Sequence, residues 1–232
     1  MKLKLLLILI CSTFALSGQQ FIGSIEVLDP LMEELISPSE RMEILAEGFK
    51  WAEGPLWVPQ LNGLLFTDVP ENKIYLWTEK EGLKLFLSPS GMTNHAPHST
   101  NEGANGLALD SDGKLVLCQH GNRAVARLKD WNTDKPEFEF LIDHYDGKWL
   151  NSPNDLAFDK SGKLFFTDPP YGLGSQDGDP IKELDFNGIY SLTKSGNVQL
   201  LDRSLKRPNG IALSKDEKTL YEGCERLGYD DL

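Results

Sequence analysis

Basic residues are scarce in this 232-residue sequence, which has 23 Lys and Arg against 35 Asp and Glu and a formal net charge of −12. The basic residues form no cluster, and binding to a phosphate backbone needs clustered cations. We therefore expect no nucleic-acid partner. The acidic excess suits solubility or cation binding instead.

Long apolar runs are also missing, apart from one at the start, MKLKLLLILICSTFALSG. Two lysines precede this run, Ala15 and Ser17 resemble a small-residue cleavage site, and the run is shorter than the roughly 20 residues of a membrane-spanning helix. We expect residues 1–17 to be a secretory signal peptide. The protein should then be periplasmic or secreted, with no membrane association after cleavage.

Several catalytic signatures are absent as well. The sequence has no G-x-S-x-G, no G-x-G-x-x-G after a strand pattern and no phosphate-binding P-loop. A serine hydrolase with a nucleophile elbow is therefore not supported, and neither is a nucleotide-binding enzyme.

What the sequence does contain is a repeat of roughly fifty residues. After a linker and closing strand at residues 18–50, copies begin at Glu53, Asn105, Asn154 and Asn209. Each copy holds short alternating apolar runs separated by turn signals, with about four strands per copy, which is typical of propeller blades. We predict an all-β chain in which residues 51–232 form an incomplete propeller of about four blades. The copies are EGPLWVPQLNGLLFTDVPENKIYLW, NGLALDSDGKLVLCQHGNRAVARL, NDLAFDKSGKLFFTDPPYG and NGIALSKDEKTLYEG.

The first residue of each copy suggests a common site. The first strand of a blade lines the central channel, so Glu53, Asn105, Asn154 and Asn209 should converge at one height around one axis. One carboxylate with several amide oxygens, and no His or Cys, favours Ca²⁺ or Mg²⁺. The alternative is that each Asn forms an ordinary turn at the entrance of its blade.

The repeat also bears on the cysteines, of which the sequence has three. Signal cleavage would leave Cys118 and Cys224, at similar positions of blades that are not neighbours. Their Cα atoms should therefore be farther apart than the roughly 7 Å that a disulfide allows. We predict no disulfide.

The motifs WAEGPLW, LNSPNDLAFDKSGKLFFTDPPYGL and RPNGIALSKDEKTLY resemble those of the gluconolactonase, regucalcin and senescence-marker-protein family of six-bladed propellers, especially its secreted bacterial members. The resemblance implies a divalent cation, commonly calcium, with magnesium, manganese or zinc as alternatives. It also implies hydrolysis of a small-molecule sugar lactone. By motif match, Glu53, Asn154 and Asn209 take the positions of the family's metal ligands.

The lactonase interpretation places further residues near the substrate. Asn105 is an addition beside the metal ligands, and His120 and Arg123 in QHGNR would contact substrate oxygens. Asp155 would orient the ligand that precedes it, and Tyr171 would line the channel mouth. A single histidine is more often structural, which is the alternative for His120.

The end of the sequence departs from the family pattern. The family's acid–base residue is usually an aspartate in a PDG motif of a later blade, but here TLYEG is followed by CERLGYDDL. We leave the catalytic residue unassigned and expect a truncated reading frame, with Asp230 and Asp231 in a solvated tail. A non-catalytic ligand-binding propeller, an inactive fragment and a phosphotriesterase stay open as alternatives.

Two weaker patterns have structural explanations. His95 and His98 have the spacing of paired metal ligands, but their proline-containing segment favours a surface connection. Asp68 and Asp168 end two FTD motifs before proline, where we expect turn residues.

Overall fold

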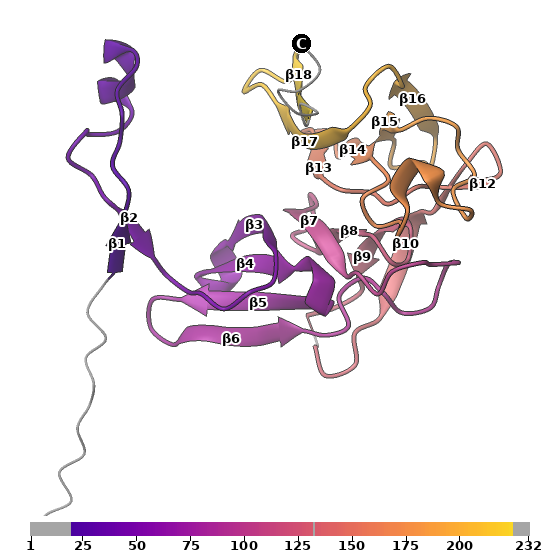
Figure 1. Cartoon of the computed structure of the whole chain (residues 1–232), viewed down its shortest axis with the longest axis horizontal. Helices are drawn as coiled ribbons and strands as arrows, with labels where there is room; N and C mark the ends of the chain where they lie inside the picture. The colour runs from indigo at the N-terminus through magenta and orange to yellow at the C-terminus, as the bar shows by residue number, and fades with distance from the viewer. Residues whose placement is uncertain (1–19, 132, 225–232) are drawn as a thin grey trace, which may run out of the picture. The chain divides into compact units, whose positions relative to one another are not determined.

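The computed structural model describes residues 20–131 and 133–224 (Figure 1). The chain divides into two compact units between Glu47 and Gly48. The predicted signal peptide lies outside the described residues, as do Asp230 and Asp231. No helix in the described ranges is both long enough and apolar enough to cross a membrane.

The first unit contains a short hairpin. Strand β1 (Gln20–Ile22) pairs antiparallel with β2 (Met42–Ile44), and the 3-10 helix η1 (Pro30–Glu34) lies between them in the chain. Asp29 caps this helix by accepting a hydrogen bond from the Leu31 N–H at 2.9 Å. No side chain from 21 to 47 is buried, so this described segment has no core of its own.

The second unit consists of antiparallel sheets in which chain neighbours pair. Within the described residues of this unit three sheets have four strands each, and β17 pairs with β18 in a two-stranded sheet. This confirms the all-β prediction and is compatible with about four blades. The first sheet contains β3 (Ala52–Val58), β4 (Gly63–Asp68), β5 (Lys73–Thr78) and β6 (Gly82–Leu87); the second contains β7 (Ala104–Leu109), β8 (Leu115–Gln119), β9 (Ala124–Leu128) and β10 (Phe138–Ile142); the third contains β13 (Leu156–Phe158), β14 (Leu164–Asp168), β15 (Gly188–Leu192) and β16 (Val198–Asp202); the fourth contains β17 (Pro208–Leu213) and β18 (Leu220–Cys224).

Short elements connect the strands of the sheets. They are η2 (Pro59–Leu61), η3 (Val69–Glu71), the hairpin of β11 (His144–Tyr145) with β12 (Lys148–Trp149), and η4 (Gln176–Gly178).

The hairpin turns follow from local sequence. In DSDGK the N–H of Lys114 donates to the Asp110 carboxylate at 2.9 Å, and Gly113 has a φ of 73°. DKSGK repeats this arrangement, with Gly162 at a φ of 82°. Glycine adopts such a positive φ without the steric cost of a Cβ, which explains why both turns have glycine at this position.

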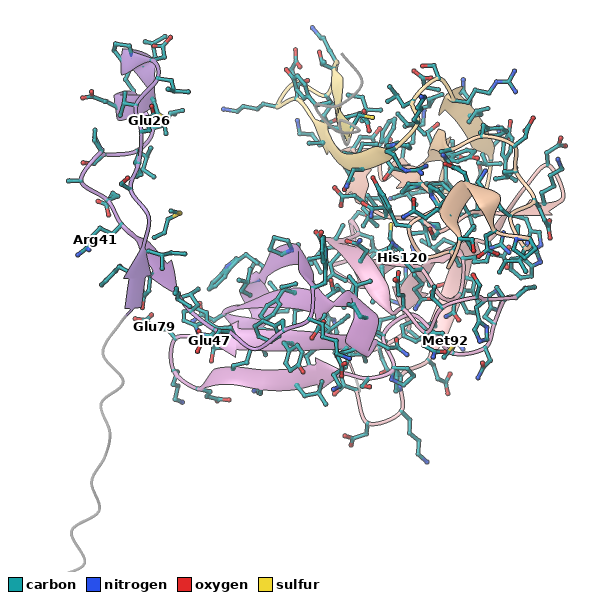
Figure 2. The ribbon with its side chains drawn as sticks, in the orientation of Figure 1. Glu26, Arg41, Glu47, Glu79, Met92 and His120 are labelled. Atoms are coloured by element: carbon teal, nitrogen blue, oxygen red, sulfur yellow. The ribbon has the colours of Figure 1, made fainter. Side chains whose placement is uncertain are left out.

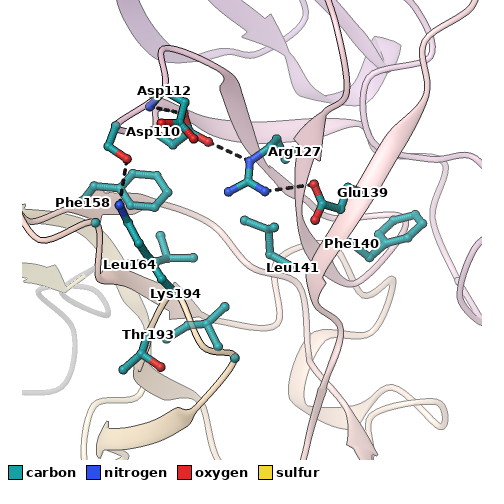
Figure 3. A pocket seen from close by; sticks show the side chains of 14 residues that line it. Asp110, Asp112, Arg127, Glu139, Phe140, Leu141, Phe158, Leu164, Thr193 and Lys194 are labelled. Atoms are coloured by element: carbon teal, nitrogen blue, oxygen red, sulfur yellow. Dashed lines mark hydrogen bonds and ion pairs between the residues drawn. The ribbon is translucent and has the colours of Figure 1, made fainter.

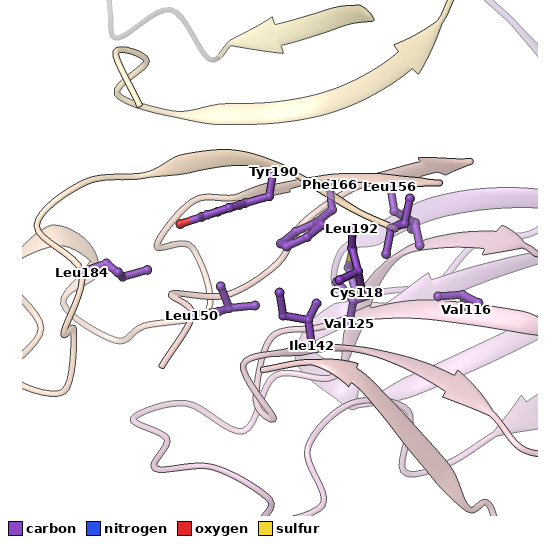
Figure 4. Packing of buried hydrophobic residues seen from close by; sticks show 11 residues of the cluster. Val116, Cys118, Val125, Ile142, Leu150, Leu156, Phe166, Leu184, Tyr190 and Leu192 are labelled. Atoms are coloured by element: carbon purple, nitrogen blue, oxygen red, sulfur yellow. The ribbon is translucent and has the colours of Figure 1, made fainter. Parts of the chain in front are cut away.

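Two apolar clusters hold neighbouring sheets together. Leu65 and Ile74 of the first sheet pack in one cluster with Leu117 of the second. In the other, Cys118 of the second sheet packs with residues of the third that include Phe166 and Tyr190, whose rings stack at 5.1 Å (Figure 4). Cys118 has a free, buried thiol whose pKa is raised by burial, whereas Cys224 is exposed.

Contacts between blade entrances bring the inner strands close together. The Thr67 hydroxyl donates to the Asn105 carbonyl at 3.2 Å, and the Thr167 hydroxyl donates to the Asn209 carbonyl at 2.7 Å. Gly54 has a φ of 54°, and a Cβ there would lie 2.2 Å from the Asn105 carbonyl oxygen. Only glycine permits this approach of two backbones, which places the entrances side by side.

Candidate active site

A cavity of about 350 Å³ lies at the entrances of the inner strands. The four residues that begin the repeats all line it, so the structure brings them together as the repeat predicts. What they bind stays a prediction. The complete lining is Trp51, Glu53, Val69, Pro70, Glu102, Asn105, His120, Asn154, Tyr171, Gln176 and Asn209.

The backbone groups of the asparagines are used to hold the blades together. Asn154 donates its N–H to the Thr167 carbonyl at 2.9 Å and accepts at its own carbonyl from the Gly106 N–H at 2.7 Å. Asn209 donates its N–H to the Glu222 carboxylate at 3.0 Å. The repeat therefore sets the position of each asparagine through its backbone.

The side chains of these asparagines, in contrast, face the cavity without protein partners. Asn105 is 7% exposed and Asn154 only 3%. Among the described residues, no hydrogen bond reaches the side-chain amides of Asn105, Asn154 or Asn209. Because buried polar groups are normally hydrogen-bonded, these amides are available to a ligand or solvent in the cavity.

Glu53 adds the negative charge of the cavity wall. One of its carboxylate oxygens accepts a hydrogen bond from the indole N–H of Trp51 at 2.9 Å. Its other oxygen has no hydrogen bond from a described residue. Glu53 thus presents a carboxylate, partly oriented by Trp51, beside the unpaired amides.

This donor set fits a hard divalent cation. Carboxylate and amide oxygens are ligands that Ca²⁺ and Mg²⁺ accept. Nowhere in the described chain do three or more His, Cys, Asp or Glu side chains gather in an arrangement that could hold a metal. A cation in this cavity would therefore be bound by Glu53 together with amide oxygens.

A histidine paired with a carboxylate also lines the cavity, and Figure 2 labels this histidine, His120. The Nδ1 atom of His120 lies 2.8 Å from a carboxylate oxygen of Glu102. His120 is 2% exposed, and its buried Nε2 atom has no hydrogen-bond partner. A Cβ at Gly172 would lie 2.6 Å from the His120 Cβ, so only glycine lets this loop pack against the imidazole.

Sequence reasoning missed five of the lining residues, namely Trp51, Val69, Pro70, Glu102 and Gln176. Trp51 lies two residues before the first repeat, and Glu102 lies three residues before the second. Their closeness to the predicted site residues was an available signal. Gln176 begins η4, a segment without repeat character, and no pattern in the sequence points to it. Tyr171 lines the cavity, and its contact with a substrate stays a prediction.

Arg123, predicted near the substrate, lies away from this cavity. Its Nε donates to the Leu150 carbonyl at 2.7 Å and its Nη1 to the Ile181 carbonyl at 3.0 Å. The side chain is 1% exposed, and burial lowers the pKa of its guanidinium. In this structure Arg123 connects loops of the interior instead of facing the cavity.

Asp155, predicted to orient the neighbouring Asn154, makes other contacts in the structure. Its carboxylate accepts from the N–H groups of Leu156 and Ile211, both at 2.9 Å, and it does not line the cavity. Burial raises its pKa, and the charge of Glu53 adds to this increase. Asp155 ties the third blade to β17 and makes no hydrogen bond with the Asn154 side chain among the described residues.

The two FTD aspartates are not simple turn residues. Asp68 accepts from the N–H groups of Lys50 and Trp51, both at 3.2 Å, and Asp168 accepts from the N–H of Asn151 at 2.8 Å. These contacts tie each strand end to the segment that enters its blade. The turn prediction missed them because the partners are 17 or 18 residues earlier in the chain.

His95 and His98 have separate protein partners. His95 Nε2 lies 2.9 Å from the Asp143 carboxylate, and its ring stacks on Phe140 with centroids 3.5 Å apart. His98 Nδ1 is 3.2 Å from the Ala96 carbonyl. Their segment is part of the packed surface around the second blade.

A second cavity of about 380 Å³ lies between the second and third sheets (Figure 3). We call it the groove. Arg127 there contacts Asp110 at 2.7 Å and Glu139 at 2.9 Å, and Lys194 donates to the Ser111 hydroxyl at 3.1 Å. Apolar side chains complete its wall, namely Phe140, Leu141, Phe158, Leu164 and Leu192.

Fold and cavity together define a β-propeller with an oxygen-lined site where its inner strands begin. Residues 51–223 match the family described as SMP-30/Gluconolactonase/LRE-like region. The chain belongs to this family, as its motifs predict.

Known relatives extend beyond the region shared with this chain. A gluconolactonase of Zymomonas mobilis is 40% identical over 202 residues, which cover 86% of this chain and 56% of that protein. The diisopropyl-fluorophosphatase of Loligo vulgaris is 24% identical over 192 residues, covering 82% and 56%. The solved structure of a gluconolactonase from Xanthomonas campestris superimposes with a TM-score of 0.67 at 34% identity, covering 79% of this chain and 58% of that one. The chain thus spans a little over half the length of these relatives.

Proposed function

We propose that this chain carries the substrate cavity of a metal-dependent sugar lactone hydrolase. Glu53, Asn154 and Asn209 would hold the divalent cation, with calcium as the first candidate, and Asn105 would lie beside it. The observation that carries the proposal is the Glu53 carboxylate in one cavity with the side-chain amides of Asn154 and Asn209, which no hydrogen bond from a described residue reaches. The similarity to gluconolactonases supports the substrate class.

The chemistry of lactone opening suits such a cavity. A bound cation would polarise the lactone carbonyl and stabilise the negative charge that develops on its oxygen. The chain's own residues bind and orient the substrate: Val69 and Pro70 offer an apolar wall to the ring carbons. Gln176 and Tyr171 bring polar side chains to the same cavity, where sugar hydroxyl groups need hydrogen-bond partners.

We further propose that the protein acts in the periplasm or outside the cell. This rests on the predicted signal peptide at residues 1–17. Determining the N-terminal residue of the protein purified from its natural host would test it, because a signal peptide is removed from the mature chain.

Replacement of Glu53 tests the proposed site. Glu53→Gln removes the negative charge at nearly constant size, so we expect at least a tenfold loss of Ca²⁺ affinity in calorimetry and a matching loss of gluconolactone hydrolysis. Glu139→Gln is the matched control, because Glu139 is a carboxylate of the groove. Its cation binding and activity should equal those of the wild type.

Removal of the metal provides a second test of the proposed metal-dependent hydrolysis. Hydrolysis, corrected for the spontaneous reaction, should fall to the background rate in a chelator and return with added Ca²⁺. Equal rates with and without chelator would end the metal-dependent proposal. Cation uptake without lactone turnover would support a ligand-binding propeller instead.

Phosphotriester hydrolysis is the second candidate function. The similarity to the diisopropyl-fluorophosphatase favours it, because an oxygen-bound cation can polarise a phosphoryl oxygen as well as a carbonyl. A phosphotriester assayed beside gluconolactone, with the same variants, separates the two substrates by their relative kcat/KM.

A further inference from the structure

We propose that Glu102 and His120 form a proton-transfer pair for lactone opening, with His120 as the catalytic base and Glu102 as its positioning residue. This rests on the proposed function, and it assigns the catalytic group that the sequence leaves open. Both residues line the same cavity as Glu53 and the asparagines.

The first observation is the orientation of the imidazole. Its Nδ1 lies 2.8 Å from the Glu102 carboxylate, which can only accept a hydrogen bond when ionised. In the neutral imidazole paired with this carboxylate, Nδ1 carries the proton and Nε2 has a free lone pair. A base held by a third group in this way is the arrangement that nucleophile activation requires.

The second observation is the lack of any protein partner for Nε2. His120 is 2% exposed, yet this ring nitrogen has no hydrogen bond, although buried polar atoms usually have one. The His120 N–H donates to the Gly103 carbonyl at 3.0 Å, the loop at Gly172 packs against its Cβ, and Glu102 pairs with Nδ1 at 2.8 Å. The imidazole thus has three contacts that set its position and one nitrogen without a partner.

The proton balance of the reaction is complete with this pair. Water attacks the lactone carbonyl carbon, a new C–O bond forms, and the water proton moves to Nε2. When the tetrahedral species collapses, the ring C–O bond breaks and Nε2–H returns the proton to the departing ring oxygen. The product is the open hydroxy acid, its carboxyl proton goes to solvent, and His120 is neutral again.

His95 provides a matched comparison within the same chain. It also pairs with a carboxylate, at 2.9 Å from Asp143, but through Nε2, and it stacks on Phe140 outside the cavity. A change at His95 removes a histidine–carboxylate contact without touching the cavity.

The main variant is His120→Asn, since an asparagine amide can keep a hydrogen bond to Glu102 but cannot take up a proton. We expect kcat for gluconolactone to fall roughly 100-fold or more, the usual contribution of a general base. KM and the Ca²⁺ affinity measured by calorimetry should stay within twofold of wild type. Glu102→Gln should lower kcat by a smaller factor, about tenfold, and His95→Gln should leave kcat unchanged.

A cavity-forming variant separates catalysis from folding. His120→Ala should be rescued in part by added imidazole, whereas the wild type and His95→Gln should not respond. If His120→Asn binds Ca²⁺ and keeps the wild-type kcat, the proton-transfer pair is wrong and the proposed lactonase stands. A failure of rescue together with an equal loss of Ca²⁺ binding assigns His120 a structural role and also overturns the pair. If the wild type opens no lactone, both proposals fail.

Discussion

The two cavities of the second unit are similar in size but differ in how their polar groups are satisfied. In the groove, of about 380 Å³, Arg127 is paired with both Asp110 and Glu139. In the entrance cavity, of about 350 Å³, amide side chains and the Nε2 of His120 have no partner among the described residues. The two cavities are thus similar in volume and differ in whether the polar groups of their walls have protein partners.

Paired and unpaired polar groups make different contributions to the free energy of unfolding. Partly exposed ion pairs such as those of Arg127 contribute roughly 0–1 kcal/mol each. A buried polar group left without a partner costs roughly 1–3 kcal/mol. In the entrance cavity the Nε2 atom of His120 is such a buried group without a partner, and no described residue of the groove contains one.

The largest change in the free energy of unfolding is expected at Gly54, where the backbones of two blade entrances are in contact. Gly54→Ala would force a Cβ to 2.2 Å from the Asn105 carbonyl oxygen and place alanine at a φ of 54°. We expect a loss of more than about 3 kcal/mol in the free energy of unfolding, because a backbone clash adds to roughly 1–2 kcal/mol for the left-handed conformation. Denaturant titration measures it.

Gly196→Ala in the groove is the matched control. Gly196 also has a positive φ, 83°, but a Cβ there meets no atom within 4 Å. Its cost should be limited to the conformational strain of roughly 1–2 kcal/mol. Equal losses for the two variants would show that the contact between blade entrances is not tight.

A smaller change in the free energy of unfolding, toward higher stability, is expected on substitution of Asn154. Asn154→Leu removes an unpaired, nearly buried amide, so the unfolding free energy should stay the same or rise by up to about 1 kcal/mol. Ca²⁺ affinity should fall at least tenfold, because a predicted ligand is lost. A clear loss of stability without loss of affinity would mean that the amide has a structural partner.

Asp168 tests whether incomplete pairing always marks a ligand site. Its Oδ1 is buried without a partner, as are Arg123 Nη2 and Tyr190 Oη, yet none of these residues lines either cavity. Burial raises the pKa of Asp168 to about 7 from a usual value of 3.8. The folded state thus binds this proton more tightly than the unfolded state, and its stabilising effect is lost as pH rises from about 4 to about 7.

Asp168→Asn should remove this part of the pH dependence. An asparagine keeps the acceptor for the Asn151 N–H and cannot ionise. Urea midpoints at pH 5 and pH 8 should therefore differ more in the wild type than in the variant. Equal differences would show that Asp168 does not titrate in this range.

The strands, and the convergence of the first residues of the repeats on one cavity, could be predicted because both depend on local, repeated patterns. For example, AVARL, the apolar run that ends the second copy, forms β9. Once each repeat is a blade, equivalent first residues must lie around one channel. Glu53 and the three asparagines could be brought together on this basis.

The remaining parts of the site depend on contacts that no periodic pattern contains. Glu102 meets His120 across 18 residues of chain. Arg123 lies close to His120 in sequence, yet its backbone adopts a φ of 53° and its side chain enters the interior. The direction of a side chain at the end of a strand is set by tertiary packing, which the sequence alone did not reveal.

The smallest change in the free energy of unfolding is expected for substitution of Arg127 in the groove. Arg127→Met keeps much of the side-chain length but removes both ion pairs, in which the side chain is 24% exposed at Arg127, 54% at Glu139 and 6% at Asp110. Because Arg127 is partly solvated and Asp110 keeps the hydrogen bonds from the N–H groups of Asp112 and Lys114, we expect a loss of about 1 kcal/mol in the free energy of unfolding, with Ca²⁺ affinity and lactone hydrolysis unchanged. Thermal melting and calorimetry on one sample measure both. A loss of cation binding in this variant would make the groove, and not the entrance cavity, the place where the unexplained chemistry of this propeller must be sought.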